Sequence, residues 1–124
     1  MKIVITEPLG ISPDLLTSLC APFAEHSFAC YDTKPASAQE LIARAREADI
    51  AIIANTPFPA EAVEACKNLK YIDVAFTGVD HVAVDLCRER GILVSNASGY
   101  SEQAVAELVI GQAIALLRRL PACD

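Results

Sequence analysis

Apolar residues occur along the chain in two kinds of run: short runs rich in β-branched residues, and longer runs with helical spacing. The first kind is typical of buried strands, and the second is typical of helices that pack on one face. The short runs predict five strands, at residues 2–7, 27–31, 49–54, 69–76 and 92–95. The longer runs predict five helices, one beginning near residue 12 and the others at residues 37–48, 60–68, 82–90 and 101–120.

Each expected strand is followed by an expected helix, which indicates a parallel sheet with helices on both faces. Right-handed crossovers between parallel strands leave few arrangements. We therefore predict an α/β fold of three layers, a flavodoxin-like doubly wound (βα)₅ parallel sheet. No linker, low-complexity segment or internal repeat divides the chain.

Residues of the expected helix ends fit this scheme. Ser12 stands before Pro13, an arrangement typical of a cap followed by the first helical residue. Gly91 directly follows the fourth helix and predicts its C-terminal stop. Asp80 and Ser101 are candidate caps for the fourth and fifth helices.

The composition narrows the possible partners. With 53% hydrophobic and 21% charged residues in 124, the chain is expected to form a globular domain without metals or disulfides. The net charge is −6 and the basic residues are scattered, so we expect no nucleic-acid partner. No apolar run reaches the roughly 20 residues of a membrane span, and Glu7 and Pro8 interrupt the N-terminal run too early for a signal peptide.

The five cysteines, at positions 20, 30, 66, 87 and 123, are odd in number and form no C-x-x-C pair. This usage argues against a zinc site or a disulfide framework, and we expect no bound metal. Reduced thiols favour a cytoplasmic location.

Ligands of open α/β sheets bind at the carboxyl ends of the strands, where the strand order reverses. That rule selects the loops after Glu7, Ala54, Phe76 and Asn96. In the loop after the fourth strand, Gly78 would let the backbone approach a ligand, and the helix that follows would offer free N–H groups to an anion. The alternative is that Gly78 only makes a tight turn and Asp80 only caps a helix.

With the blocks at residues 70–80, 90–96 and 104–107 in this order, the chain resembles the D-isomer-specific 2-hydroxyacid dehydrogenases, the phosphoglycerate dehydrogenase-like group. The resemblance covers essentially the whole chain. It implies a substrate-binding, flavodoxin-like domain at residues 1–100 and a linking helix at 101–124 that leads toward a nucleotide-binding domain. It also implies a small 2-hydroxy or 2-oxo acid as substrate, NAD or NADP as cofactor, and a homodimer formed through the 101–120 helix.

The same resemblance assigns site residues. The backbone of Thr77, Gly78 and Val79 would hold the substrate carboxylate, with Asn55 and Tyr100 on the rim of the cleft. Thr77 and Val105 match positions that approach the nicotinamide.

The chain also departs from the family pattern. Its glycines stand at positions 10, 78, 91, 99 and 111, and no pair of them has the G-x-G-x-x-G spacing of a dinucleotide site. The family's Arg, carboxylate and acid–base His lie further downstream, and neither His26 nor His81 matches that His. We therefore expect no catalytic residue in this chain, no NAD or NADP bound to it alone, and no activity from what we interpret as the N-terminal segment of a longer enzyme.

Other functions stay open at this point. A phosphoacceptor receiver domain has the same (βα)₅ pattern, but it needs acids where this chain has Pro8 and Asn55, and a Lys where it has residues 96–98. A flavin electron carrier needs a hydroxyl- and glycine-rich loop where residues 7–10 stand. A non-catalytic module that binds a small acid or dimerises is the third alternative.

Overall fold

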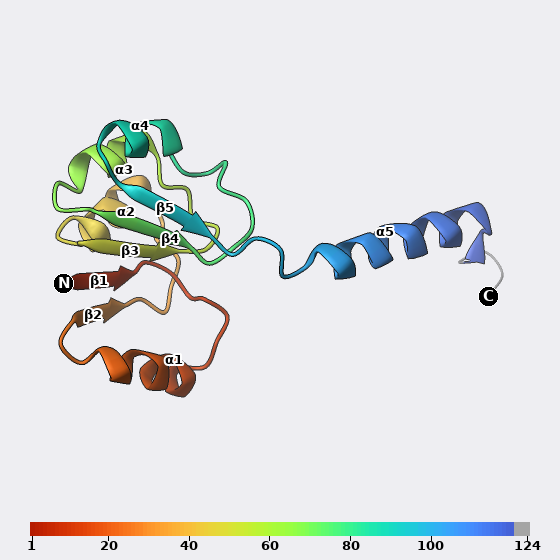
Figure 1. The fold of residues 1–124 in the computed structure, drawn as a ribbon, viewed down its shortest axis with the longest axis horizontal. Helices are drawn as coiled ribbons and strands as arrows, with labels where there is room; N and C mark the ends of the chain where they lie inside the picture. The colour runs from red at the N-terminus through yellow and green to blue at the C-terminus, as the bar shows by residue number, and fades with distance from the viewer. Residues whose placement is uncertain (121–124) are drawn as a thin grey trace.

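In a computed structural model, which describes residues 1–120, five parallel strands form one sheet flanked by helices (Figure 1). The strands are β1 (Lys2–Ile5), β2 (Ser27–Cys30), β3 (Ile50–Ile53), β4 (Tyr71–Val74) and β5 (Leu93–Asn96). The helices are α1 (Pro13–Cys20), α2 (Ala38–Ala45), α3 (Ala60–Ala65), α4 (Val84–Glu89) and α5 (Glu102–Leu117), with a short 3₁₀ turn, η1, at Ala21–Phe23. The strand order β2-β1-β3-β4-β5 confirms the predicted flavodoxin-like arrangement.

The apolar core lies between the sheet and one layer of helices. Side chains of β1, β3 and β4, among them Val4, Ile53 and Ile72, are fully buried against α2, α3 and α4. Helix α1 lies on the opposite side of the sheet (Figure 1) and has no buried residue. The core therefore fixes β1, β3 and β4, the three strands whose carboxyl ends carry the loops of interest.

Two of the expected helix ends are confirmed. The Leu15 N–H donates to Ser12 Oγ at 3.2 Å, as a capping serine should. Gly91 has a φ of 70°, and the N–H groups of Gly91 and Ile92 donate to the carbonyls of Arg88 and Cys87. This pair of bonds forms a Schellman motif, which needs the left-handed conformation that glycine adopts without strain.

The other two cap predictions are wrong. Helix α4 begins at Val84, two residues later than expected, and no side chain, that of Asp80 included, caps it. The delay arises because Val82 pairs with Phe58 in a β-bridge, so that this stretch of backbone is extended rather than helical. Ser101 occupies the position before α5, but its side chain makes no capping hydrogen bond.

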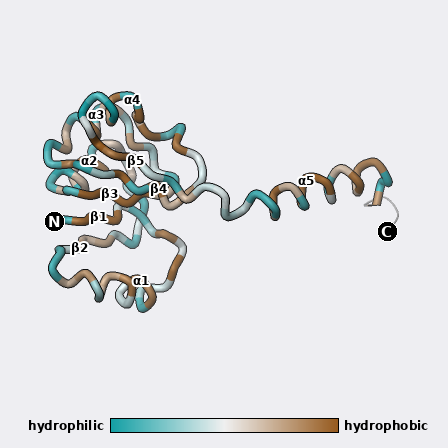
Figure 2. The backbone as a smooth tube through the Cα atoms, in the orientation of Figure 1, coloured by the Kyte–Doolittle hydropathy of each residue, from teal (hydrophilic) through white to brown (hydrophobic). Residues whose placement is uncertain are grey.

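Helix α5 projects away from the sheet (Figure 1). Apolar residues recur along its whole length (Figure 2), yet none of its residues is buried, and Leu116 and Leu117 are 75% and 83% exposed. The domain boundary at residue 101 stays a prediction, and residues 121–124 of the expected linking segment lie outside the described residues. Within residues 1–120, no helix is both long and apolar enough to cross a membrane.

The burial of the thiols gives a first testable prediction. Cys66 and Cys87 are fully buried, and this burial raises the pKa of both thiols despite the nearby Arg90, so that little reactive thiolate forms. Cys30 is exposed at the surface and Cys20 is half-buried. We expect a disulfide reagent at about pH 8 to modify Cys20 and Cys30 well before Cys66 and Cys87, which should react only as fast as the protein unfolds; burial and the neighbouring Cys20 raise the pKa of the Cys30 thiol and should slow its reaction.

Peptide mapping by mass spectrometry after timed quenching would separate these sites, with a sample in denaturant as the control in which every thiol reacts. Rapid modification of Cys66 or Cys87 in the folded protein would contradict the packing of α3 and α4 on the sheet.

Candidate functional site

The carboxyl ends of β1, β3, β4 and β5 meet at the edge of the sheet from which the chain leaves for α5 (Figure 1). From this edge, the chain runs after β1 to α1 on one face and after β3 to α3 on the other. The neighbouring strands β1 and β3 therefore form the switch point at which ligands bind in folds of this kind.

The loop after β4 is mostly exposed. Thr77 and Gly78 are exposed, whereas Val79 is half-buried and packs on the core. Within residues 1–120, the backbone N–H groups of Thr77, Gly78 and Val79 donate to no protein acceptor. The Thr77 carbonyl is held by Asn96 Nδ2, which donates to it at 2.5 Å from the end of β5. The N–H groups of Phe76, Asp80 and His81 likewise donate to no acceptor among these residues, so the loop leaves a stretch of N–H donors that suits an anionic acceptor.

The conformation of Gly78 does not explain why glycine stands there. Its φ lies outside the left-handed region, and a Cβ built on it would meet only Asp80 Oδ2, at an ordinary 3.7 Å. Neither a left-handed turn nor crowding within the chain demands a glycine at this position. The expectation that the following helix offers its N–H groups to an anion is wrong. Helix α4 begins six residues after Gly78, so its N-terminus does not supply the N–H groups of this loop.

The loop after β3 is anchored by a side chain from the segment that follows β1. Glu7 is fully buried, and its Oε1 accepts hydrogen bonds from the N–H groups of Ala54, at 2.9 Å, and Thr56, at 2.7 Å. Its Oε2 is buried without a partner among the described residues. Asn55, an exposed residue predicted to lie on the cleft rim, stands between the two residues that Glu7 binds.

A second anchor comes from the loop after β4. His81 is half-buried, and its Nε2 lies 3.0 Å from the Ala54 carbonyl oxygen. In the sequence, His81 matches no catalytic position, and Glu7 is marked only as the end of a strand whose following loop is a candidate ligand loop. A signal for Glu7 was present, since a glutamate at the end of an apolar strand is buried and needs partners.

Tyr100 and Val105 lie where the chain leaves the sheet edge. Tyr100 is 70% exposed, next to Gly99 with its φ of 88°, and Val105 is 55% exposed in the first turns of α5. Asn96 joins the loops after β4 and β5, but no hydrogen bond joins Tyr100 or Val105 to Thr77 within the described chain. The roles of Asn55, Thr77, Gly78, Val79, Tyr100 and Val105 in binding stay predictions.

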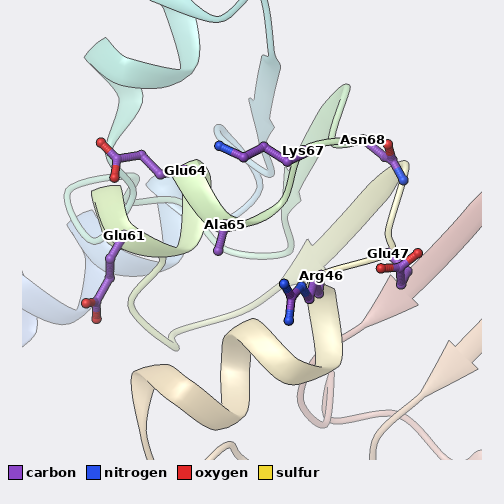
Figure 3. Close-up of a pocket in the computed structure, with 7 residues that line it drawn as sticks. All are labelled: Arg46, Glu47, Glu61, Glu64, Ala65, Lys67 and Asn68. Atoms are coloured by element: carbon purple, nitrogen blue, oxygen red, sulfur yellow. The ribbon is translucent and has the colours of Figure 1, made fainter.

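Of two surface hollows, the first lies away from these loops, whereas Glu7 and Pro8 after β1 line the second. The first, of about 410 Å³, is lined by Arg46, Glu47, Glu61, Glu64, Ala65, Lys67 and Asn68, near the amino ends of β3 and β4 (Figure 3). Its side chains carry both charges and point in different directions, as Figure 3 shows, so it lacks the convergent groups of a ligand site. The other, of about 920 Å³, lies beneath α1 and is mainly apolar. Among residues 1–120, no group of three or more potential ligands could hold a metal ion.

A parallel sheet of this order, with helices on both faces, defines a flavodoxin-like domain. Residues 3–116 match the family model of the D-isomer specific 2-hydroxyacid dehydrogenase, catalytic domain. The chain belongs to this family.

Known proteins similar to the chain include a putative 2-hydroxyacid dehydrogenase of Haemophilus influenzae, 34% identical over 97% of this chain and 37% of that protein. A D-3-phosphoglycerate dehydrogenase of Methanocaldococcus jannaschii is 33% identical over 98% of this chain and 22% of its own length. Among solved structures, an acyclic imino acid reductase in complex with NADPH and D-Arg superposes with a TM-score of 0.87 and 30% identity, over 100% of this chain and 39% of that one. The chain therefore spans well under half the length of each of these proteins.

Proposed function

We propose that the chain is the substrate-binding segment of an NAD(P)-dependent D-2-hydroxyacid dehydrogenase, and that Thr77, Gly78 and Val79 bind the substrate carboxylate through their backbone. The observation that carries the proposal is that the N–H groups of Thr77, Gly78 and Val79 donate to no acceptor among residues 1–120, around a glycine that the fold itself does not require. A carboxylate accepts several hydrogen bonds at once, and charge-assisted bonds of this kind are stronger than neutral ones. The net charge of −6 is no obstacle, because the donors are backbone dipoles rather than basic side chains.

The family membership supports this substrate class. The relatives named above act on 2-hydroxy acids by their names, and the imino acid reductase was solved with D-Arg, which also carries a carboxylate beside the carbon bearing its nitrogen. The carboxylate is the group that such ligands share, and a protein that binds them needs donors for it. In this proposal, Asn55 and Tyr100 on the rim contact the remainder of the acid.

The residues present fit one part of the cofactor. Thr77 and Val105 offer a hydroxyl and an exposed apolar surface at the sheet edge, which would flank a nicotinamide ring, and the ring would supply or accept the hydride. The glycine spacing offers no site for the pyrophosphate. Cofactor binding and the acid–base step are therefore assigned to a further part of the protein.

The same proposal makes α5 a homodimer interface, because residues 101–120 expose apolar side chains along a projecting helix. Its alternative is a non-catalytic module that binds a small acid or only dimerises. The alternative shares the carboxylate loop and α5, and it differs in lacking any coupling to a nicotinamide cofactor.

An NMR titration of the ¹⁵N-labelled chain tests the proposal. We expect D-lactate or glyoxylate to shift the amide signals of Thr77, Gly78 and Val79, because a bound carboxylate accepts hydrogen bonds from these N–H groups. Lactamide, the neutral counterpart of lactate, should leave them in place. Under the same conditions, NADH should bind without saturation, as judged by its fluorescence, because the chain lacks a pyrophosphate site.

Shifts confined to residues outside this loop would contradict the carboxylate assignment. Saturable NADH binding to the 124-residue chain would show that the cofactor site does not depend on a further domain.

A further inference from the structure

Ala54, the first residue after β3, is held through both of its backbone polar groups. Its N–H donates to Glu7 Oε1 at 2.9 Å, and its carbonyl lies 3.0 Å from His81 Nε2. The same Glu7 oxygen accepts the Thr56 N–H at 2.7 Å. The backbone on both sides of Asn55 is therefore fixed by two side chains that come from two other loops.

The chemistry of these contacts is specific. A carbonyl oxygen can only accept, so the proton of the His81 bond resides on Nε2. Glu7 binds two N–H groups with a single oxygen, while its Oε2 is buried and unpartnered among residues 1–120. A fully buried carboxyl group with one unpaired oxygen is a poor means of adding stability. The effect of the Glu7 carboxyl group is to fix the backbone of Ala54 and Thr56 on either side of Asn55.

Further bonds couple the Asn55 loop to the segment that follows Gly78. The Phe58 N–H donates to the His81 carbonyl at 2.8 Å, and the Ala83 N–H donates to the Phe58 carbonyl at 3.1 Å. The backbone of residues 54–58 is thus joined to residues 81–83 at three points, once through the His81 ring and twice through main-chain bonds. A displacement of either segment must be transmitted to the other.

We propose that Glu7 and His81 are positioning residues of the substrate site, which set the place of Asn55 relative to the carboxylate-binding backbone of Thr77 to Val79. This inference rests on the proposed function. Neither side chain needs to touch the substrate. Glu7 acts through the N–H groups of Ala54 and Thr56, and His81 acts through the Ala54 carbonyl.

Steady-state kinetics of the full-length enzyme test the inference. Glu7→Met keeps the volume of the side chain and removes both acceptors, and His81→Phe keeps a ring and removes the donor. We expect each to raise the KM for the 2-oxo acid by about tenfold, with kcat and the KM for NADH changed by less than about twofold. Glu7→Gln retains an oxygen that can accept both N–H groups, and it should restore most of the affinity.

The matched control is Glu64→Met, at an exposed glutamate of α3, which should leave all three constants unchanged. An unchanged KM for the 2-oxo acid in His81→Phe or in folded Glu7→Met would overturn the inference. If Glu7→Met does not fold, the KM of His81→Phe alone tests the inference, because the His81 side chain is half-buried and can be replaced without loss of the fold.

A wild-type enzyme that reduces no 2-oxo acid would refute the proposed function rather than the loop geometry. Amide hydrogen exchange in the 124-residue chain then decides the positioning role. Faster exchange at Ala54 and Thr56 in His81→Phe or Glu7→Met than in Glu64→Met supports the role, and equal exchange overturns it.

Discussion

Replacement of Gly78 by Val should abolish productive binding of the acid while leaving the fold intact. The Gly78 backbone is not left-handed and a Cβ would have ordinary space, so the chain itself tolerates a side chain there. A carboxylate held against the N–H groups of residues 77–79 would meet the branched side chain directly. Loss of two charge-assisted hydrogen bonds, worth about 1.5–3 kcal/mol each, predicts a decrease in kcat/KM of about 10²- to 10⁴-fold. The measurement is kcat/KM of the full-length enzyme for a 2-oxo acid, with thermal unfolding measured on the same sample.

Gly91→Val provides a matched control with the opposite outcome. Gly91 has a φ of 70°, in the turn after α4 and at the other edge of the sheet from the loop. A β-branched residue there should cost about 1–2 kcal/mol of folding free energy and lower the melting temperature by several degrees, with KM unchanged. If Gly78→Val instead lowers the melting temperature while KM stays at the wild-type value, glycine is needed for the turn and the carboxylate assignment falls.

The fold could be predicted from the sequence because the strand-and-helix alternation repeats five times and each repeat supports the same arrangement. The helix ends could be predicted where the hydrogen bonds that form them join residues close together in the sequence. Ser12 caps α1 and Gly91 ends α4 through bonds to residues within five positions along the chain. The Asp80 prediction failed because a long-range partner, Phe58, keeps residue 82 in an extended conformation.

Part of the candidate site could be predicted because it depends on the order of strands and loops along the chain. The rule for strand ends selects the loop at Thr77 and Gly78, since it depends only on which residues follow each strand. Glu7 and His81 escaped notice because their partners are backbone groups of Ala54, 47 and 27 residues away along the chain. A sequence pattern records side-chain types: it indicates that a buried glutamate needs partners, and it does not identify the distant main chain that supplies them. The sequence also indicated a glycine turn at Gly78, and only the observed φ shows that the turn does not require one.

Charged substitutions in α5 should convert a dimer into a monomer. Its apolar side chains are exposed throughout, which a monomeric protein avoids and a second copy of the helix would cover. Because the helix is apolar on more than one side, two paired variants cover two stripes: Val109→Lys with Leu116→Lys, and Ile110→Lys with Leu117→Lys. Lysine in a desolvated interface is costly, so we expect at least one pair to weaken association by about 100-fold or more.

Light scattering coupled to size-exclusion chromatography, across micromolar concentrations, gives the mass directly. Leu15→Lys is the matched control, since Leu15 is an exposed leucine of α1, a helix separate from α5 (Figure 1), and its replacement should preserve the dimer. A wild-type monomer at high micromolar concentration would refute the interface. Dissociation by Leu15→Lys, with both α5 variants still dimeric, would move the interface to α1.

Because no residue of α5 is buried by the rest of the described chain, monomeric α5 variants should keep the wild-type amide shifts at Thr77, Gly78 and Val79. That separation would show that carboxylate binding and dimerisation reside on different parts of this domain.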